Sequence, residues 1–348
     1  MNYEEISKLL QYNEYKGSES KIFMPNEIFE DLIKSLNEEL PQKEQSKVEY
    51  ITEKNKVRKK RGLNKGVSTN HIAFAYSYIY LVTWLYRYTK YTVLKSGISN
   101  STIKEILGYK PETRTVNYLI IKNGLLDKIG YLETHKDFPV WWSQSQYEAL
   151  DFQMYSEEKD SFPYHTIPKN FTIKYPIKGF YREVNDDGTV EIEGTFNEVD
   201  NTHCVPFEVF MYCMSKDDIG CTGFYLYSYL LHKNDIYGDY DVSLEDLSKQ
   251  TGIADRTLDK YLGILKAYRM IDFKINQEFF AIGLREEDRM ANTYSINEYG
   301  EFSNEPIPYD KINIVKKKDY FQMLEDKKQM DREIWGGILD IPLESLPY

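Results

Sequence analysis

Two short stretches of this chain carry the residue types that contact nucleic acid. In the later stretch the candidates are Arg256, Thr257, Lys260 and Arg269. In the earlier stretch they are Thr113, Arg114, Asn117 and Lys122. Arginine can bind guanine through two hydrogen bonds, asparagine can bind adenine in the same way, and threonine or lysine can hold phosphate oxygens. These residues are therefore candidates for reading duplex DNA.

The same residues also fit a simpler interpretation, in which they form the solvated face of amphipathic helices. Acidic residues weaken the DNA interpretation for the later stretch, because Asp255 and Asp259 would repel phosphate. The earlier stretch has the face that suits DNA better.

A third segment concentrates positive charge and contains no acidic residue. Its basic residues are Lys54, Lys56, Arg58, Lys59, Lys60, Arg61 and Lys65. Such a run can enter a minor groove or follow phosphates, and it can equally be a solvated linker. For the DNA hypothesis we include Lys56, Arg58, Lys59, Lys60 and Arg61.

Catalytic motifs are missing from the sequence. It contains no GxxxxGK[ST] phosphate loop, no GxGxxG and no HExxH, and its five histidines are scattered. The acidic run Glu286–Asp288 is typical of a solvated loop, because a cation site needs carboxylates that converge. We therefore expect no enzyme activity and no cofactor.

The cysteine pattern argues against both zinc and disulfides. Cys204, Cys213 and Cys221 form no CxxC pair, and with His203 they lack the spacing of a zinc knuckle. Three thiols are also an odd number for disulfide pairing. A reducing cytoplasm fits this pattern.

The later stretch predicts two helices and a pair of strands. Ser243 can cap a first helix, and Gly252 can end it in the left-handed conformation. Asp255 can cap a second helix, whose buried face would carry Leu258, Leu262 and Leu265. Residues 273–275 and 279–282 then read as two strands joined by a short turn. This order predicts a winged helix–turn–helix, with the second helix in the major groove.

The earlier stretch reads as a first copy of this unit. A long apolar helix over 70–86 precedes a short helix over 101–107, a turn and a second helix over 112–123. We pair Leu125–Asp127 with Met270–Asp272, and Tyr76–Tyr78 with Tyr227–Tyr229. The repeated order of helices and strands supports the relationship between the two stretches more than their shared residues do.

These elements divide the chain into six parts. They are N-terminal helices (1–45), a basic linker (46–69), a first winged helix (70–137), an aromatic insert (138–204), a second winged helix (205–298) and a C-terminal extension (299–348). Two amphipathic helices are expected within 1–40, a hairpin turn at Asp187-Gly188, a helix over 223–233 and another over 311–328.

Composition limits the class of protein. The chain has 348 residues, 41% of them hydrophobic, so it can bury a core. Its formal net charge of −11 argues against a protein that coats DNA nonspecifically, although it leaves site-specific binding open. The most apolar helix, over 72–85, is too short to cross a membrane, which takes about 20 apolar residues.

The segments Val205–Phe210, Tyr225–Leu231 and Leu244–Ile271 resemble initiator proteins of plasmids and phages in Gram-positive bacteria. In that family a proline-led helix precedes a Leu-Tyr-rich helix and then the DNA-reading pair. The resemblance implies tandem winged helices that bind origin repeats in double-stranded DNA and recruit host replication proteins. The aromatic insert has no counterpart in this pattern.

We therefore expect an α+β, mostly helical protein, with two winged helix–turn–helix domains joined by an irregular, strand-containing insert. Its expected function is sequence-specific binding of double-stranded DNA, in replication initiation. A transcriptional regulator with the same fold is the alternative, and a protein-interaction adaptor that has lost DNA binding is another. A homo-oligomer remains open, and no membrane partner is expected.

Overall fold

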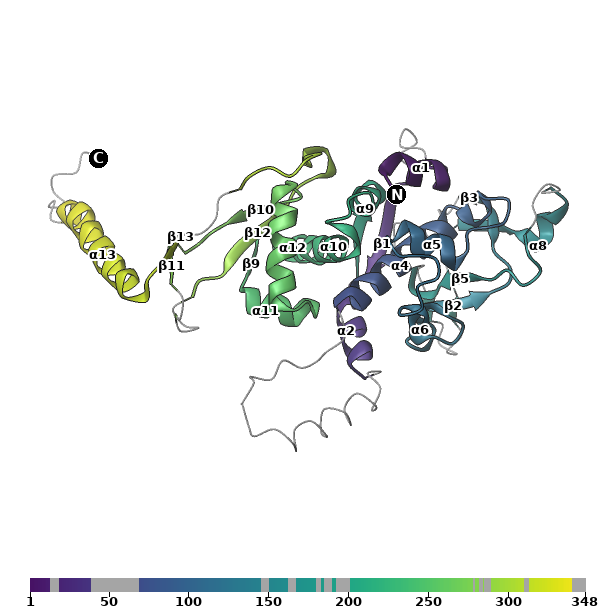
Figure 1. The fold of residues 1–348 in the computed structure, drawn as a ribbon, viewed down its shortest axis with the longest axis horizontal. Coiled ribbons are helices and arrows are strands. Elements are labelled where there is room, and N and C mark those ends of the chain that lie inside the picture. The colour runs from purple at the N-terminus through teal and green to yellow at the C-terminus, as the bar shows by residue number, and fades with distance from the viewer. Residues whose placement is uncertain are drawn as a thin grey trace, which may run out of the picture.

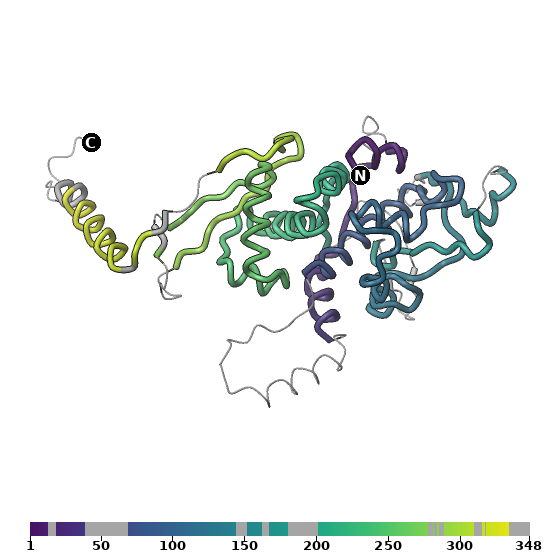
Figure 2. Tube along the Cα trace, in the orientation of Figure 1, coloured from purple at the N-terminus to yellow at the C-terminus, as the bar shows by residue number. Residues whose placement is uncertain are grey.

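The protein was analysed as a computed structural model, which describes the following residues: 1–12, 19–38, 69–144, 150–161, 167–179, 183–184, 190–191, 201–277, 279–281, 284, 289–309 and 313–339. Figure 2 traces the chain in colour along most of these ranges. The basic run Lys54–Lys65 and the acidic run Glu286–Asp288 lie outside the described residues. Within them the fold is α+β, with helices around several small sheets (Figure 1).

Two long apolar helices form the centre of the molecule. Helix α4 (Thr69–Arg87) and helix α10 (Gly220–Tyr237) pack against each other, and each is buried along most of its length. Their tyrosines keep hydrogen bonds inside this core: the Tyr80 hydroxyl donates to the Val205 carbonyl at 2.8 Å, and the Tyr225 hydroxyl donates to the Thr251 carbonyl at 3.0 Å. The predicted central helix over 70–86 and the predicted helix over 223–233 are both confirmed.

The N-terminal segment contributes two helices, as predicted, and one strand that was not predicted. Helix α1 (Tyr3–Leu10) begins with a capping box between Asn2 and Glu5. Strand β1 (Lys21–Pro25) pairs antiparallel with β8 (Thr202–Pro206), and helix α2 (Ile28–Glu38) contacts both α4 and α11. These contacts join the N-terminus to the second half of the chain.

The first half departs from the prediction at its second helix. After η2 (Lys90–Thr92) and α5 (Asn100–Ile106), the helix predicted over 112–123 is replaced by two short helices, α6 (Asn117–Ile120) and α7 (Leu125–Lys128). The predicted helix is wrong at both ends: residues 111–116 are not helical, and the chain leaves the helix at Ile121, whose ψ of 165° is extended, before Asn123 takes a left-handed φ of 59°. Strand β2 (Leu132–His135) follows and pairs antiparallel with β5 (Ile173–Pro176).

The insert between the two halves consists of short elements. They are β3 (Pro139–Gln144), β4 (Leu150–Met154), α8 (Tyr155–Glu158), η3 (Lys159–Ser161), η4 (Ile177–Gly179), β6 (Glu183–Val184) and β7 (Val190–Glu191). The predicted hairpin is confirmed as a pairing, since Val184 lies opposite Val190 in an antiparallel pair. Its turn at Asp187-Gly188 lies outside the described residues.

The second half is ordered helix, helix, strand, helix, helix and then the strands β10 (Ile271–Lys274) and β12 (Asn292–Ile296). Helix α9 (Phe207–Met214) precedes α10, and the unit continues with β9 (Tyr240–Val242), α11 (Leu244–Thr251), α12 (Asp255–Ala267), β10 and β12. The sheet order is β10-β12-β9, so the last strand lies between the other two. This half is drawn in green in Figure 1.

Most local predictions for the second half are confirmed. Ser243 caps α11 by accepting a hydrogen bond from the Asp246 amide at 3.0 Å, and Gly252 ends that helix with a φ of 67°. Leu258, Leu262 and Leu265 are buried. The predicted Asp255 cap is wrong, because Ala254 holds the N-cap position and Asp255 is the first helical residue.

The predicted hairpin between residues 273–275 and 279–282 is wrong. Strand β10 pairs with β12, and β11 (Phe279–Ala281) pairs in parallel with β13 (Asn313–Val315). The Asn276 side chain joins the two ends of the long connection between β10 and β12. Its amide donates to the Ala291 carbonyl at 2.9 Å and to the Thr293 hydroxyl at 2.8 Å. Beyond η6 (Tyr299–Glu301), helix α13 (Lys317–Leu339) begins later and runs further than the predicted helix over 311–328.

One hydrophobic cluster joins both halves. It includes Ile6 near the N-terminus and Tyr294 on β12, together with most of α4 and α10. The ring of Phe29 stacks on Tyr76 of α4 and lies 5.6 Å from the Tyr225 ring of α10. The two halves of the described chain therefore share a core.

Candidate nucleic-acid interface

The same backbone construction occurs once in each half. Gly108 and Gly252, both with left-handed φ angles, follow the short helices α5 and α11. Another left-handed residue, Gly130 or Arg269, precedes the following strand, and the first half has a further one, Asn123, between α6 and α7. Just after Gly130 and Arg269, the Tyr131 amide donates to the Leu126 carbonyl at 3.1 Å, and the Met270 amide donates to the Leu265 carbonyl at 2.9 Å.

This construction changes the internal alignment of the two halves. We had paired Leu125–Asp127 with Met270–Asp272, but Leu125–Asp127 lies in helix α7, whereas Ile271 and Asp272 lie in strand β10. The hydrogen bonds pair Leu126 with Leu265 instead. Helices α6 and α7 together thus occupy the place that α12 fills in the second half.

In the second half, two of the predicted DNA-contacting residues are exposed near the start of α12. Arg256 and Lys260 are exposed, and Thr257 is half-buried. Arg269 is also exposed, beyond the end of the helix. Asp255 and Asp259 are exposed beside these residues and reduce the positive potential there.

The C-terminal part of α12 is covered by a later segment of the chain. The Ile307 amide donates to the Ala267 carbonyl at 2.8 Å, and the Tyr309 hydroxyl lies where a side chain at Gly263 would project. A Cβ atom at that glycine would be 2.7 Å from the Tyr309 oxygen. Ile307 and Tyr309 therefore cover α12 around Ala267 and Gly263, whereas Arg256 and Lys260 near its start are exposed.

In the first half, two of the four predicted residues are held in internal contacts. The buried Lys104 ammonium donates to the Thr113 carbonyl at 2.7 Å and to the Asn117 side-chain oxygen at 2.5 Å. Burial lowers the pKa of Lys104, and Glu112 opposes that shift. Adenine recognition by Asn117 would use its side-chain oxygen, which this contact already engages.

Arg114 and Lys122 remain exposed, and the structure adds two further lysines to them. Lys110 and Lys128 are exposed in the same region, between Gly108 and Gly130. Our sequence reasoning missed both lysines because neither lies on the helix predicted over 112–123. Their position between the two left-handed glycines would have indicated them.

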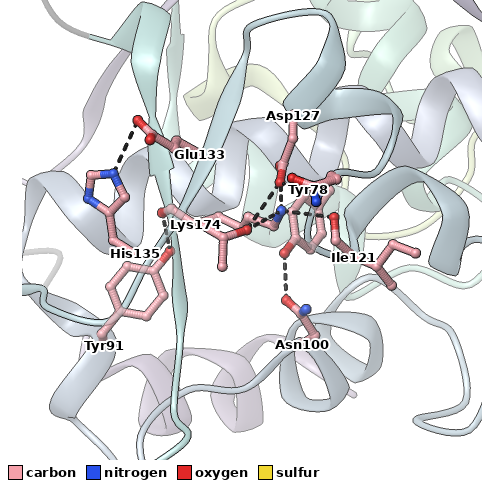
Figure 3. Close-up of polar contacts among 10 residues, drawn as sticks. Tyr78, Tyr91, Asn100, Ile121, Asp127, Glu133, His135 and Lys174 are labelled. Carbon is pink, nitrogen blue, oxygen red and sulfur yellow. Dashed lines mark hydrogen bonds and ion pairs between the residues drawn. The ribbon is translucent and has the colours of Figure 1, made fainter.

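A buried ion pair contacts the backbone at the break between α6 and α7 (Figure 3). The Lys174 ammonium contacts the Asp127 carboxylate and donates to the Ile121 carbonyl at 3.1 Å and to the Thr134 hydroxyl at 2.9 Å. Asp127 also accepts a hydrogen bond from the Asn123 amide at 2.9 Å. Burial lowers the pKa of Lys174, and Asp127 opposes that shift.

This network fixes a turn that projects outward. Lys174 satisfies the carbonyl at the start of the break, and Asp127 satisfies the amide within it, so the turn needs no further partners to hold its shape. Ile121, Lys122 and Asn123 are exposed on it. The first half therefore presents a rigid basic turn, where the second half presents a continuous helix.

Metal chemistry finds no support in the described part of the chain. No group of three or more histidine, cysteine or acidic residues there could hold an ion, and its three cysteines are free. His203 is buried between other partners: its Nε2 accepts from the Tyr76 hydroxyl at 2.8 Å, and its Nδ1 donates to the Asn26 side-chain oxygen at 3.0 Å. None of the described helices is both long and apolar enough to span a bilayer.

Comparison with protein-family models, with curated proteins and with solved structures finds no match to this chain.

Proposed function

We propose that the chain binds double-stranded DNA at a specific sequence. In this proposal residues 220–296 form a winged helix–turn–helix, and the first half from α4 to β5 is a divergent copy of it. The order of helices and strands in the second half supports the assignment, as does the central position of β12 in its sheet. The repeated hydrogen bonds of Tyr131 and Met270 support the relationship between the halves.

The observation that carries the proposal is the placement of exposed basic residues within the repeated construction. The first half exposes Arg114 and Lys122 between Gly108 and Gly130, and the second half exposes Arg256 and Lys260 between Gly252 and Arg269. These arginines can donate to guanine edges, and the lysines can contact phosphates. The acidic net charge of the whole chain then favours specific binding over nonspecific coating.

For the biological role we propose initiation of replication on a plasmid or phage, with host replication proteins as further partners, in the cytoplasm. The resemblance of Val205–Phe210, Tyr225–Leu231 and Leu244–Ile271 to initiator proteins supports this role. The basic run Lys54–Lys65 would add phosphate contacts. Regulation of transcription would use the same DNA-binding surfaces.

Selection from a pool of random duplexes tests the proposal directly. The full chain would be incubated with the pool at low ionic strength, and the bound duplexes would be amplified and sequenced over several rounds. We expect the pool to converge on a shared sequence. A pool that stays random while a known DNA-binding protein selects its site in parallel would rule the proposal out.

A further inference from the structure

A groove of about 930 Å³ opens beside α12, along the face that carries Asp259, Leu262, Gly263 and Lys266. Its walls come from β9, the start of α11, one face of α12 and the strands β10 and β12. Tyr309 closes part of it from the C-terminal extension. The groove is therefore built from elements of the second half together with the segment that follows it.

Aromatic rings line the floor of the groove and already hold one cation. The Lys266 ammonium lies 3.8 Å from the ring centre of Phe273, 5.4 Å from that of Tyr294 and 6.0 Å from that of Tyr309. Contacts of this kind attract cations to the faces of the rings. Burial lowers the pKa of Lys266 to about 8, and Asp259 opposes that shift.

Acidic residues dominate the rim of the groove. Asp241, Glu245, Asp246 and Asp259 all line it and are exposed. Lys249 pairs with Glu245 at 3.1 Å and with Asp246 at 3.7 Å, but these surface pairs are exposed and weak.

The basic groups that line the groove are Lys266 and Arg289. The Arg289 guanidinium donates two hydrogen bonds to the Leu284 carbonyl, at 3.0 and 2.8 Å. The four carboxylates outnumber these two basic groups, so the residues that line the groove carry an excess of negative charge.

Exposed apolar side chains complete the surface. Leu244, at the start of α11, is 38% exposed, and Met290, before β12, is 60% exposed. Both line the groove, so a partner can bury apolar side chains there as well as place cations on the rim. DNA, which is uniformly anionic and has no apolar side chains, fits neither feature.

We propose that this groove binds an extended, basic segment of a partner protein that carries apolar side chains between its cations. Its lysine or arginine side chains would face the four rim carboxylates, and its apolar side chains would contact Leu244 and Met290. Lys266 occupies the aromatic floor in the free protein and repels the incoming cations. The proposal does not rest on DNA binding, because none of the four basic residues assigned to DNA lines the groove.

Fluorescence anisotropy with a labelled peptide of alternating lysine and leucine tests this assignment. We expect the full chain to bind it, and to ignore a peptide with glutamate in place of lysine. Combining Asp241→Asn, Glu245→Gln, Asp246→Asn and Asp259→Asn should weaken binding on the order of tenfold, since each exposed charge contributes modestly. Lys266→Gln should instead tighten binding, because it removes a competing cation.

Glu4→Gln on helix α1 is the matched control, since Glu4 is exposed and away from the groove. Thermal unfolding would show whether each variant is folded. If the fourfold variant does not fold, the change in peptide affinity caused by Lys266→Gln still tests the proposal. Equal affinity for both peptides, or weaker binding by Lys266→Gln, would overturn the proposal.

The chain's own basic run is the remaining occupant to test. A variant with Lys54, Lys56, Arg58, Lys59, Lys60, Arg61 and Lys65 replaced by glutamine should bind the peptide as the unmodified chain does. Peptide binding that appears only in this variant would overturn the assignment to a partner protein, because the chain itself would then fill the groove.

Discussion

The Lys174 ammonium lies against the Asp127 carboxylate, directly beneath the turn that separates α6 from α7 (Figure 3). The pair does more than neutralise two buried charges. Through Ile121 and Asn123 it satisfies the backbone groups that the interrupted helix leaves without helical partners. The exposed turn that carries Lys122 therefore takes its shape from a residue on β5.

Lys174→Met should destabilise the protein by about 3–5 kcal/mol, because it removes the only cation that pairs with the Asp127 carboxylate among the described residues. Urea unfolding measures the free energy directly. Lys178→Met is the control, since Lys178 pairs with Glu27 and Asp31 but is partly exposed, and it should cost much less. If the two variants lose equal stability, the buried pair does not support the turn as we describe.

Stability should fall with acid through His203. Burial, aided by the nearby charge of His232, lowers the pKa of His203 to about 3, against about 6.5 in an unfolded chain. The unfolded chain therefore binds a proton between these values that the folded chain does not. Above pH 6.5 the neutral His203 does not reduce the free energy of unfolding. As the pH falls from 6.5 toward 3, the free energy of unfolding decreases by up to about 1.4 kcal/mol per pH unit.

His203→Gln tests this dependence, because glutamine does not titrate and can still hydrogen-bond. Urea unfolding between pH 7 and pH 5 should give a shallower loss of stability than in the unmodified chain. His71→Gln is the control, since His71 is only part-buried, although burial also lowers its pKa. An unchanged slope in His203→Gln would show that this histidine does not control acid sensitivity.

Leu262→Asp should unfold the second half, because it places a charge on the buried face of α12. Leu262→Ala at the same position should cost about 2–5 kcal/mol and leave a folded protein. Circular dichroism during heating compares the two variants. A Leu262→Asp protein with an intact thermal transition would refute the packing of this helix.

Replacing Lys56, Arg58, Lys59, Lys60 and Arg61 by glutamine should lower affinity for every DNA sequence alike. Each phosphate contact that is lost should flatten the slope of log affinity against log salt by about 0.9. Affinity measured at several salt concentrations gives this slope. A loss confined to one sequence would instead show that the run reads bases.

The sequence predicts elements whose patterns are local. The apolar coverage of α4 indicates a buried helix, and Ser243 with Gly252 marks both ends of α11. The Leu258, Leu262 and Leu265 spacing predicts the buried face of α12. Each of these patterns lies within a few turns of chain, so the residues that decide the structure are close together in sequence.

The sequence could not predict features that depend on distant partners. The break after α6 depends on Lys174, far along the chain from Ile121. The parallel pairing of β11 with β13 joins segments on either side of β12, so no hairpin pattern indicates it. The groove beside α12 was missed for the same reason, because Tyr309 returns to that helix from the C-terminal extension.

The most direct test of DNA binding is a titration of the selected duplex with two double variants. Arg114→Ala with Lys122→Ala, and Arg256→Ala with Lys260→Ala, should each weaken binding about tenfold or more, at about 1–3 kcal/mol per base contact. Lys8→Ala with Lys169→Ala removes the same charge from exposed positions elsewhere and should have little effect. If all three variants bind the selected duplex like the unmodified chain, these surfaces do not contact DNA.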